Sequence, residues 1–123
     1  MTRAEEVDLE EFFADAPRAR ALHDAVVALI GGVGETETRV TRSQVAFRRR
    51  KGFAYTWRPD RYVRSDVPLV LSFALPERLD SDRFKEVVQP APRVWMHHLE
   101  LRDADQLDDE VHGWLERAWA NAA

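Results

Sequence analysis

Apolar side chains recur every three or four residues near both ends of the chain, a spacing that is typical of amphipathic helices. The clearest stripe runs from Leu22 to Ile30, with Pro17 at a position that suits a first helical turn and glycines after the stripe. This pattern predicts a helix over about residues 17–30. A shorter stripe over residues 9–13 predicts a short helix, and a stripe over residues 107–119 predicts a C-terminal helix that Asp105 caps.

The middle of the chain has a period of two instead, which is typical of β-strands. The strands are expected at residues 36–40, 43–48, 53–58, 67–75 and 93–102. The residues between the second and third strands, 49–52, predict a hairpin turn in which Gly52 supplies a positive φ.

A short helix is expected between the last two strands, around residues 84–88, with Asp80 or Ser81 as its cap and Pro90 and Pro92 ending it. The order of elements predicts an α+β fold, with a single-layer, mostly antiparallel five-stranded sheet packed with N- and C-terminal helices. Residues 17–121 are expected to form this one domain, and residues 1–16 an N-terminal extension or short helix.

Alternation along the strands sorts their side chains onto two faces of the sheet. The large apolar set is expected to pack against the two long helices: Val45, Phe47, Phe53, Tyr55, Trp57, Leu69, Leu71, Phe73, Trp95, Leu99 and Leu101. The other face carries small or polar residues: Gln44, Ala46, Arg48, Ala54, Thr56, Arg58, Ser72, Ala74, Met96, His98 and Glu100. Either another element covers this second face, or it is a shallow groove where Arg48, Arg58 and His98 converge on an anion.

Composition narrows the classes of protein that fit. The chain has 123 residues and no cysteine, which excludes a disulfide scaffold, a thiol nucleophile and an iron–sulfur site. It has no apolar run long enough to span a bilayer and no segment that resembles a signal peptide. We therefore expect a soluble, cytoplasmic domain of a bacterial protein that does not associate with a membrane.

The formal net charge of −4 conceals an uneven distribution along the chain. Residues 39–64 hold 9 basic residues and 1 acidic residue, whereas the segments on either side each carry a net charge of −6. Aromatic residues alternate with the basic ones between residues 53 and 57, and a positive groove with an aromatic platform is how proteins bind single-stranded nucleic acid.

These patterns name the candidate binding residues. A small-anion or phosphate site is expected from Arg42, Ser43, Gln44, Arg48, Arg58 and His98, and a nucleic-acid patch from Arg49, Arg50 and Lys51. Two observations oppose a nucleic-acid role: the alternation sends the aromatic side chains into the core, and the whole chain is acidic. The alternative is a solvated hairpin tip, or a basic patch that pairs with acidic helices of the same chain or of a second copy.

Other chemistry has less support in the sequence. His97 and His98 are adjacent on a strand, so they point to opposite faces and cannot share a metal ion, and no metal site or cofactor is expected. His97 is expected to be a core histidine. His98 lies on the polar face with Glu100, so an enzyme that uses His98 as a general base is a further alternative, although no nucleophile motif accompanies it.

Three segments carry recognisable motifs. The segment 39–48 contains T-R-S-Q-V-A-F-R and is followed by Gly52-Phe53-Ala54, the segment 94–101 contains W-x-x-H and then a leucine, and the segment 105–118 contains D-x-L-D and W-L-x-x-A. They resemble the two signatures and the closing helix of a bacterial family known only as a domain of unknown function, DUF5655. The resemblance covers residues 17–120 and implies a single α+β domain. It directs attention to Thr41, Arg42, Ser43, Arg48 and His98, and it implies no catalytic residue.

We therefore expect a non-catalytic binding module that recognises nucleic acid or a small phosphorylated ligand through its basic hairpin and polar sheet face. A protein–protein or homodimerisation module is the alternative, through the hairpin edge or the helix that carries Trp114 and Trp119.

Overall fold

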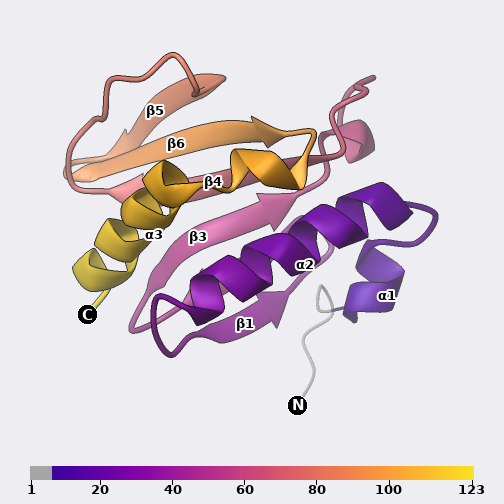
Figure 1. Ribbon diagram of the computed structural model, residues 1–123, viewed down its shortest axis with the longest axis horizontal. Helices are drawn as coiled ribbons and strands as arrows, with labels where there is room; N and C mark the ends of the chain where they lie inside the picture. Colours follow the sequence, from indigo (N-terminus) through magenta and orange to yellow (C-terminus); the bar gives the residue numbers. More distant parts are fainter. Residues whose placement is uncertain (1–6) are drawn as a thin grey trace.

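The computed structural model describes residues 7–123 and has two layers, a sheet and a pair of helices that cover one face of it (Figure 1). The helices are α2 (Pro17–Gly31) and α3 (Asp109–Asn121), and a short helix α1 (Leu9–Phe12) precedes α2. The strands are β1 (Glu37–Val40), β2 (Val45–Arg48), β3 (Gly52–Trp57), β4 (Leu69–Leu75), β5 (Glu86–Ala91) and β6 (Val94–Leu101). Short 3₁₀ helices span Pro59–Arg61 and Ala104–Gln106.

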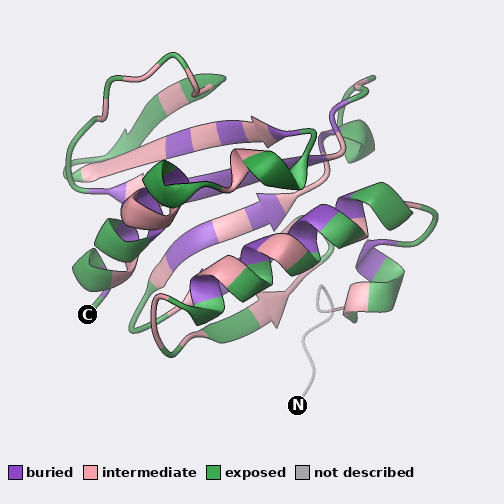
Figure 2. Cartoon of the chain, in the orientation of Figure 1, coloured by how far each residue is buried: buried purple, intermediate pink, exposed green. Residues whose placement is uncertain are grey.

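All neighbouring strands are antiparallel, in the order β1-β2-β3-β4-β6-β5. This confirms the α+β fold with an open antiparallel sheet, but the sheet has six strands, not five. The hydrophobic core lies between the sheet and the two helices, and Figure 2 shows buried positions along the central strands and mostly exposed ones along β5. Its largest fully buried apolar side chains are Phe12, Phe47, Phe53, Phe73, Leu69, Leu71, Leu75, Leu99, Leu101 and Leu115.

The sixth strand is β5, where the sequence predicted a short helix around residues 84–88. Val87 and Val88 pair with His97 and Met96 of β6, and β-branched side chains favour this extended conformation. Pro90 is tolerated because β5 is an edge strand, whose outer side needs no backbone donor. The chain then reverses through a two-residue turn in which Arg93 has a φ of 62°.

The face assignment of β3 was correct for Phe53 and wrong for Tyr55 and Trp57. Tyr55 lies opposite Ser72 of β4 on the helix-free face, whereas Thr56 lies opposite the core residue Leu71. Phe53 still enters the core because the β2–β3 register shifts beside it. Alternation alone says which residues share a face of the sheet, not which face the helices cover. Here α2 packs over the smaller residues of β3.

A buried polar contact accompanies the packing of α2 on the smaller side chains of β3. Nδ1 of His23, on α2, lies 2.9 Å from Oγ1 of Thr56, and both side chains are buried. Tyrosine or tryptophan in place of Thr56 would hold the helix away from the sheet and leave His23 without this partner. Arg58, one of the predicted site residues, follows β3 and holds the N-terminal segment against the sheet.

Two local predictions need correction. Gly52 does not have a positive φ; instead, a Cβ there would collide with the hydroxyl oxygen of Tyr55, so a larger residue would make that ring move. The last helix is capped by Asp108, whose side chain accepts a hydrogen bond from the backbone N–H of Val111, rather than by Asp105. Asp103 caps the preceding 3₁₀ helix in a reciprocal pair with Gln106.

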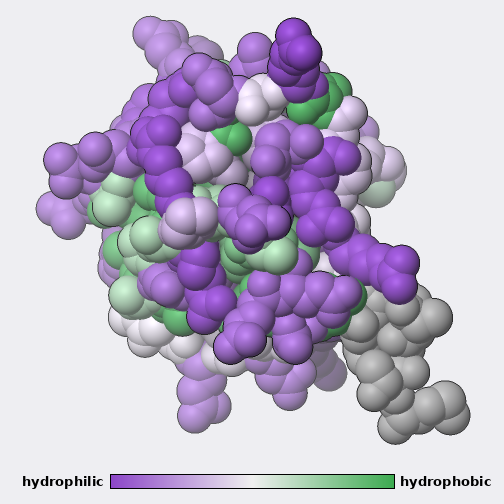
Figure 3. Space-filling view, turned by 90° about the vertical axis from the view of Figure 1, so that its right-hand side faces the viewer, coloured by the Kyte–Doolittle hydropathy of each residue, from purple (hydrophilic) through white to green (hydrophobic). Residues whose placement is uncertain are grey.

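The N-terminal region contributes to the core. Phe12 and Phe13 are both buried, with their rings 4.8 Å apart, and the first of them belongs to α1. The part of the predicted N-terminal extension at residues 1–6 lies outside the described residues. No helix within residues 7–123 is both long and apolar enough to cross a bilayer. The side of the molecule shown in Figure 3 is mostly hydrophilic.

Candidate functional site

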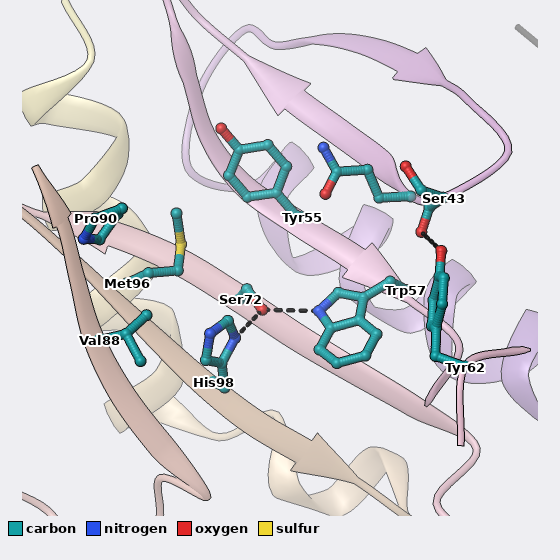
Figure 4. A pocket seen from close by; sticks show the side chains of 10 residues that line it. Ser43, Tyr55, Trp57, Tyr62, Ser72, Val88, Pro90, Met96 and His98 are labelled. Carbon is teal, nitrogen blue, oxygen red and sulfur yellow. Dashed lines mark hydrogen bonds between the residues drawn. The ribbon is translucent and has the colours of Figure 1, made fainter. Parts of the chain in front are cut away.

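A pocket of about 620 Å³ opens on the helix-free face of the sheet. Figure 4 shows its lining side chains rising from the strands and, for Ser43 and Tyr62, from the connecting loops, with the helices behind the sheet. Aromatic and apolar groups dominate, and the full lining is Ser43, Gln44, Tyr55, Trp57, Tyr62, Ser72, Val88, Pro90, Met96 and His98. A volume of this size and mostly apolar walls with a few polar groups are typical of sites for small organic ligands.

The floor of the pocket is organised by a hydrogen-bonded chain across three strands. The indole N–H of Trp57 donates to Oγ of Ser72 at 2.9 Å, and the same oxygen lies 2.6 Å from Nδ1 of His98 (Figure 4). These residues stand on β3, β4 and β6, and Ser72 is directly opposite His98 in the β4–β6 register. The indole and imidazole rings are perpendicular, with centroids 6.1 Å apart. The antiparallel register therefore fixes the orientation of both rings.

A tyrosine from the loop after β3 forms one wall. The hydroxyl of Tyr62 donates to the backbone carbonyl of Ser43 at 3.1 Å, and its ring meets Trp57 edge to face at 6.2 Å. Ser43 and Gln44 belong to a tight turn that the hydroxyl of Thr41 closes by accepting the backbone N–H of Gln44 at 3.3 Å. This turn brings both residues to the pocket.

Burial changes the acid–base properties of two lining groups. Desolvation lowers the pKa of His98 below its usual value, with the carboxylate of Glu86 partly opposing the shift, so the imidazole is neutral at pH 7. Burial raises the pKa of the Tyr55 phenol, and the positive charge of Arg48 partly opposes that shift. The pocket therefore presents neutral hydrogen-bonding groups, with a guanidinium beside it.

The structure brings together only some of the residues predicted to form the site. Ser43, Gln44 and His98 all line the pocket, whereas Arg42 is exposed on the turn that carries Ser43. Arg48 lines a separate hollow of about 780 Å³ beside Glu37 and Trp119.

Arg58 does not converge with Arg48 and His98. Its guanidinium donates to the backbone carbonyls of Phe12 and Ala14 at 3.0 and 3.3 Å and pairs with Asp60. Arg58 therefore holds the N-terminal segment that follows α1 against the sheet, and these contacts occupy the donors that an anion would need.

The basic hairpin tip is divided between structural and free side chains. The guanidinium of Arg49 lies 3.5 Å from the centroid of the Trp119 ring and donates to the backbone carbonyl of Trp119, which ties the tip to α3. Arg50 and Lys51 are exposed, and within residues 7–123 their side chains have no hydrogen-bond or ion-pair partner.

The short distance between Ser72 and His98 does not make a hydrolytic site. Ser72 is 3% exposed, and its oxygen already accepts a hydrogen bond from Trp57, which lowers its nucleophilicity. The predicted partner Glu100 lines a neighbouring hollow together with His98 and Glu86, but no carboxylate among the described residues is hydrogen-bonded to His98. In the described part of the chain, no cluster of three or more histidine and carboxylate side chains is arranged to hold a metal ion.

The sequence model of one family, described as Domain of unknown function (DUF5655), matches residues 9–122. The chain belongs to the DUF5655 family. No curated protein and no solved structure matches it.

Membership in DUF5655 confirms the resemblance drawn from the sequence, and the structure shows where the resembling segments lie. The first segment, which begins at residue 39, places the Thr41–Gln44 turn at the pocket. The second segment, residues 94–101, forms β6, with His98 facing the pocket and His97 facing the core. His97 is a core histidine, as predicted: its Nε2 accepts the backbone N–H of Leu79 at 3.0 Å, and its ring stacks on Phe73.

Sequence reasoning missed the aromatic part of the pocket. The apolar pattern predicts Tyr55 and Trp57 in the core because they are large, and Tyr62 lies between two expected strands, where no site residue is predicted. No local signal could have placed the first two, because alternation requires only that Tyr55 and Trp57 point away from Thr56 and does not say which of these faces the core.

Proposed function

We propose that this protein is a non-catalytic module that binds single-stranded nucleic acid on the helix-free face of its sheet, and we expect it to act in the cytoplasm. The observation that carries the proposal is the position of Tyr55 and Trp57 on that face. An open sheet with exposed aromatic side chains on its central strands is a common platform for stacking unpaired bases.

The ring of Trp57 is suited to this role. Its N–H is satisfied by Ser72, and in Figure 4 the indole is seen face on across the floor of the pocket. A base that stacks there would need no change in the sheet. Stacking on an aromatic side chain contributes about 1–3 kcal/mol per base, with little dependence on base identity.

Positively charged side chains come from the turn before β2 and from the β2–β3 hairpin: Arg42, Arg48, Arg50 and Lys51 are not paired with a carboxylate within residues 7–123. None of them lines the pocket itself, but Arg48 is close enough to Tyr55 to oppose the rise in the pKa of that phenol. Glu86 and Glu100 lie on the β5–β6 side and would repel phosphate. The sugar–phosphate backbone is therefore expected to follow β2 and β3, with bases turned toward Trp57.

Fluorescence anisotropy with a labelled oligo(dT), at about 50 mM and about 200 mM salt, tests the proposal. We expect binding that weakens with salt, and weaker binding of a duplex, whose paired bases cannot reach the pocket. Trp57→Ala should reduce affinity by about tenfold or more, since one stacked base is lost. Absence of oligo(dT) binding at the lower salt concentration would refute the proposal.

Two arginine variants separate the phosphate contacts from overall charge. Arg48→Ala should weaken binding and make its salt dependence less steep. Arg20→Ala removes the same charge from α2, on the helix layer, where Arg20 pairs with Asp24 at 3.0 Å, and it should leave binding unchanged. Equal losses in the two variants would mean that net charge, not this face, governs the interaction.

A further inference from the structure

We propose that His98 reads the bound base: its neutral imidazole carries hydrogen on Nε2, held there by Ser72 and Trp57, and this N–H donates to a carbonyl oxygen or ring nitrogen of a base stacked on Trp57. This inference rests on the proposed function and adds the residue that recognises the base and the kind of atom it recognises.

The hydrogen positions follow from counting donors and acceptors at Ser72. The indole N–H of Trp57 can only donate, so it occupies one lone pair of Oγ. If Nδ1 of His98 also donated, the hydroxyl hydrogen of Ser72 would have no acceptor within residues 7–123, because Trp57 and His98 are its only side-chain partners there. A buried hydroxyl that is left unsatisfied is costly, and Ser72 is 3% exposed.

The alternative satisfies every group. Ser72 accepts from Trp57 and donates to Nδ1 of His98 across 2.6 Å, which places the imidazole hydrogen on Nε2. Burial favours the neutral ring. Nε2 has no hydrogen-bond partner in the described part of the chain, so its N–H remains available to a ligand.

The other polar groups of the pocket are compatible with reading the edge of a base. The hydroxyl of Tyr62 and the indole N–H are already used within the protein. The amide of Gln44 has no partner within residues 7–123 and lines the pocket from the β2 side, whereas His98 lines it from β6. A planar base over Trp57 would lie between the fixed Nε2–H donor of His98 and the side-chain amide of Gln44, which can both donate and accept hydrogen bonds.

Two measurements test the assignment. In the ¹⁵N spectrum of the wild-type protein near pH 7, the two ring nitrogens of His98 should have the shifts of the tautomer with hydrogen on Nε2, and Ser72→Ala should shift this towards a mixture. A wild-type spectrum showing hydrogen on Nδ1 overturns the inference. The wild-type spectrum needs neither a ligand nor a folded variant.

Binding supplies the second measurement. His98→Leu should weaken oligo(dT) binding by about tenfold, the value of one hydrogen bond, without changing its salt dependence. His98→Gln keeps a donor and should retain more affinity than His98→Leu. A matching abasic oligonucleotide, which has the phosphates but no bases, should bind the wild-type protein more weakly than oligo(dT).

The outcomes separate the two proposals. If the wild-type protein binds oligo(dT) and His98→Leu binds it as tightly, the role of His98 is wrong but the single-strand surface stands. If the abasic strand binds the wild-type protein as tightly as oligo(dT) does, both the role of His98 and the single-strand surface are wrong. If wild-type protein does not bind oligo(dT), the proposed function itself fails, whatever the tautomer of His98. Urea unfolding of each variant confirms that a loss of binding is not a loss of fold.

Discussion

His23 makes the stability of this fold depend on pH. Its side chain is 1% exposed, lies between the rings of Phe13 and Phe47, and has Thr56 as its hydrogen-bond partner. Desolvation lowers its pKa to about 4 from the usual 6.5, with Asp24 partly opposing the shift. The folded protein therefore favours the neutral imidazole, while the unfolded chain takes up a proton at higher pH.

The sign and size of the effect follow from these two pKa values. The stabilisation is fully present above pH 6.5 and is lost as pH falls from 6.5 towards 4, because protons bind the unfolded chain first. At about 1.36 kcal/mol per pKa unit, the full difference is about 3 kcal/mol, and about 2 kcal/mol of it is lost by about pH 5.

Urea unfolding at about pH 7.5 and about pH 5 measures this loss. We expect the free energy of unfolding to fall further in the wild-type protein than in His23→Gln, by about 2 kcal/mol. Comparing the two decreases in free energy of unfolding between the two pH values cancels the cost of the substitution itself. It also cancels the contributions of His97 and His98, whose lowered pKa values act in the same direction in both proteins.

His112→Gln is the matched control, since this histidine lies partly exposed on α3 rather than in the core. On acidification, this variant should lose as much free energy of unfolding as the wild-type protein does. If His23→Gln loses as much stability on acidification as the wild-type protein does, the buried neutral imidazole is not the source of the pH dependence.

Four further substitutions test the packing of the fold, three by urea unfolding and Arg58→Ala by proteolysis. Gly52→Ala should destabilise the protein by at most about 1 kcal/mol, because the new methyl group makes the hydroxyl end of the Tyr55 ring move, whereas Gly113→Ala meets open space in mid-helix and should stabilise it by about 0.5–1 kcal/mol. Arg58→Ala should free the segment after α1 and speed proteolysis there; an unchanged cleavage rate would contradict its packing role. Arg93→Gly should stabilise the β5–β6 turn by up to about 1 kcal/mol, since a φ of 62° suits glycine; a loss of stability would contradict this.

Local patterns were enough to locate most of the elements of the fold. The α2 stripe, its Pro17 start and the alternation along β4 each depend on neighbours close in sequence, so they could be read without the tertiary structure. The failure at β5 has a physical reason: prolines normally end an element, but an edge strand tolerates Pro90 because its outer side has no partner strand.

The candidate site was predictable only in part. His98, Gln44 and Ser43 were selected because they were polar residues in the right strands or turns, and all three line the pocket. Arg58 was selected for its charge, yet besides Asp60 its partners are two backbone carbonyls more than forty residues away, contacts that no local pattern encodes.

The sequence by itself determined the α+β class, the helix stripes, the basic central segment and the DUF5655 resemblance. Only the tertiary structure decided which face of β3 is covered. Alternation requires that Thr56 and Trp57 point opposite ways, but the direction is chosen by what α2 can pack against. His23 on that helix pairs with Thr56, and this leaves Trp57 and Tyr55 on the open face.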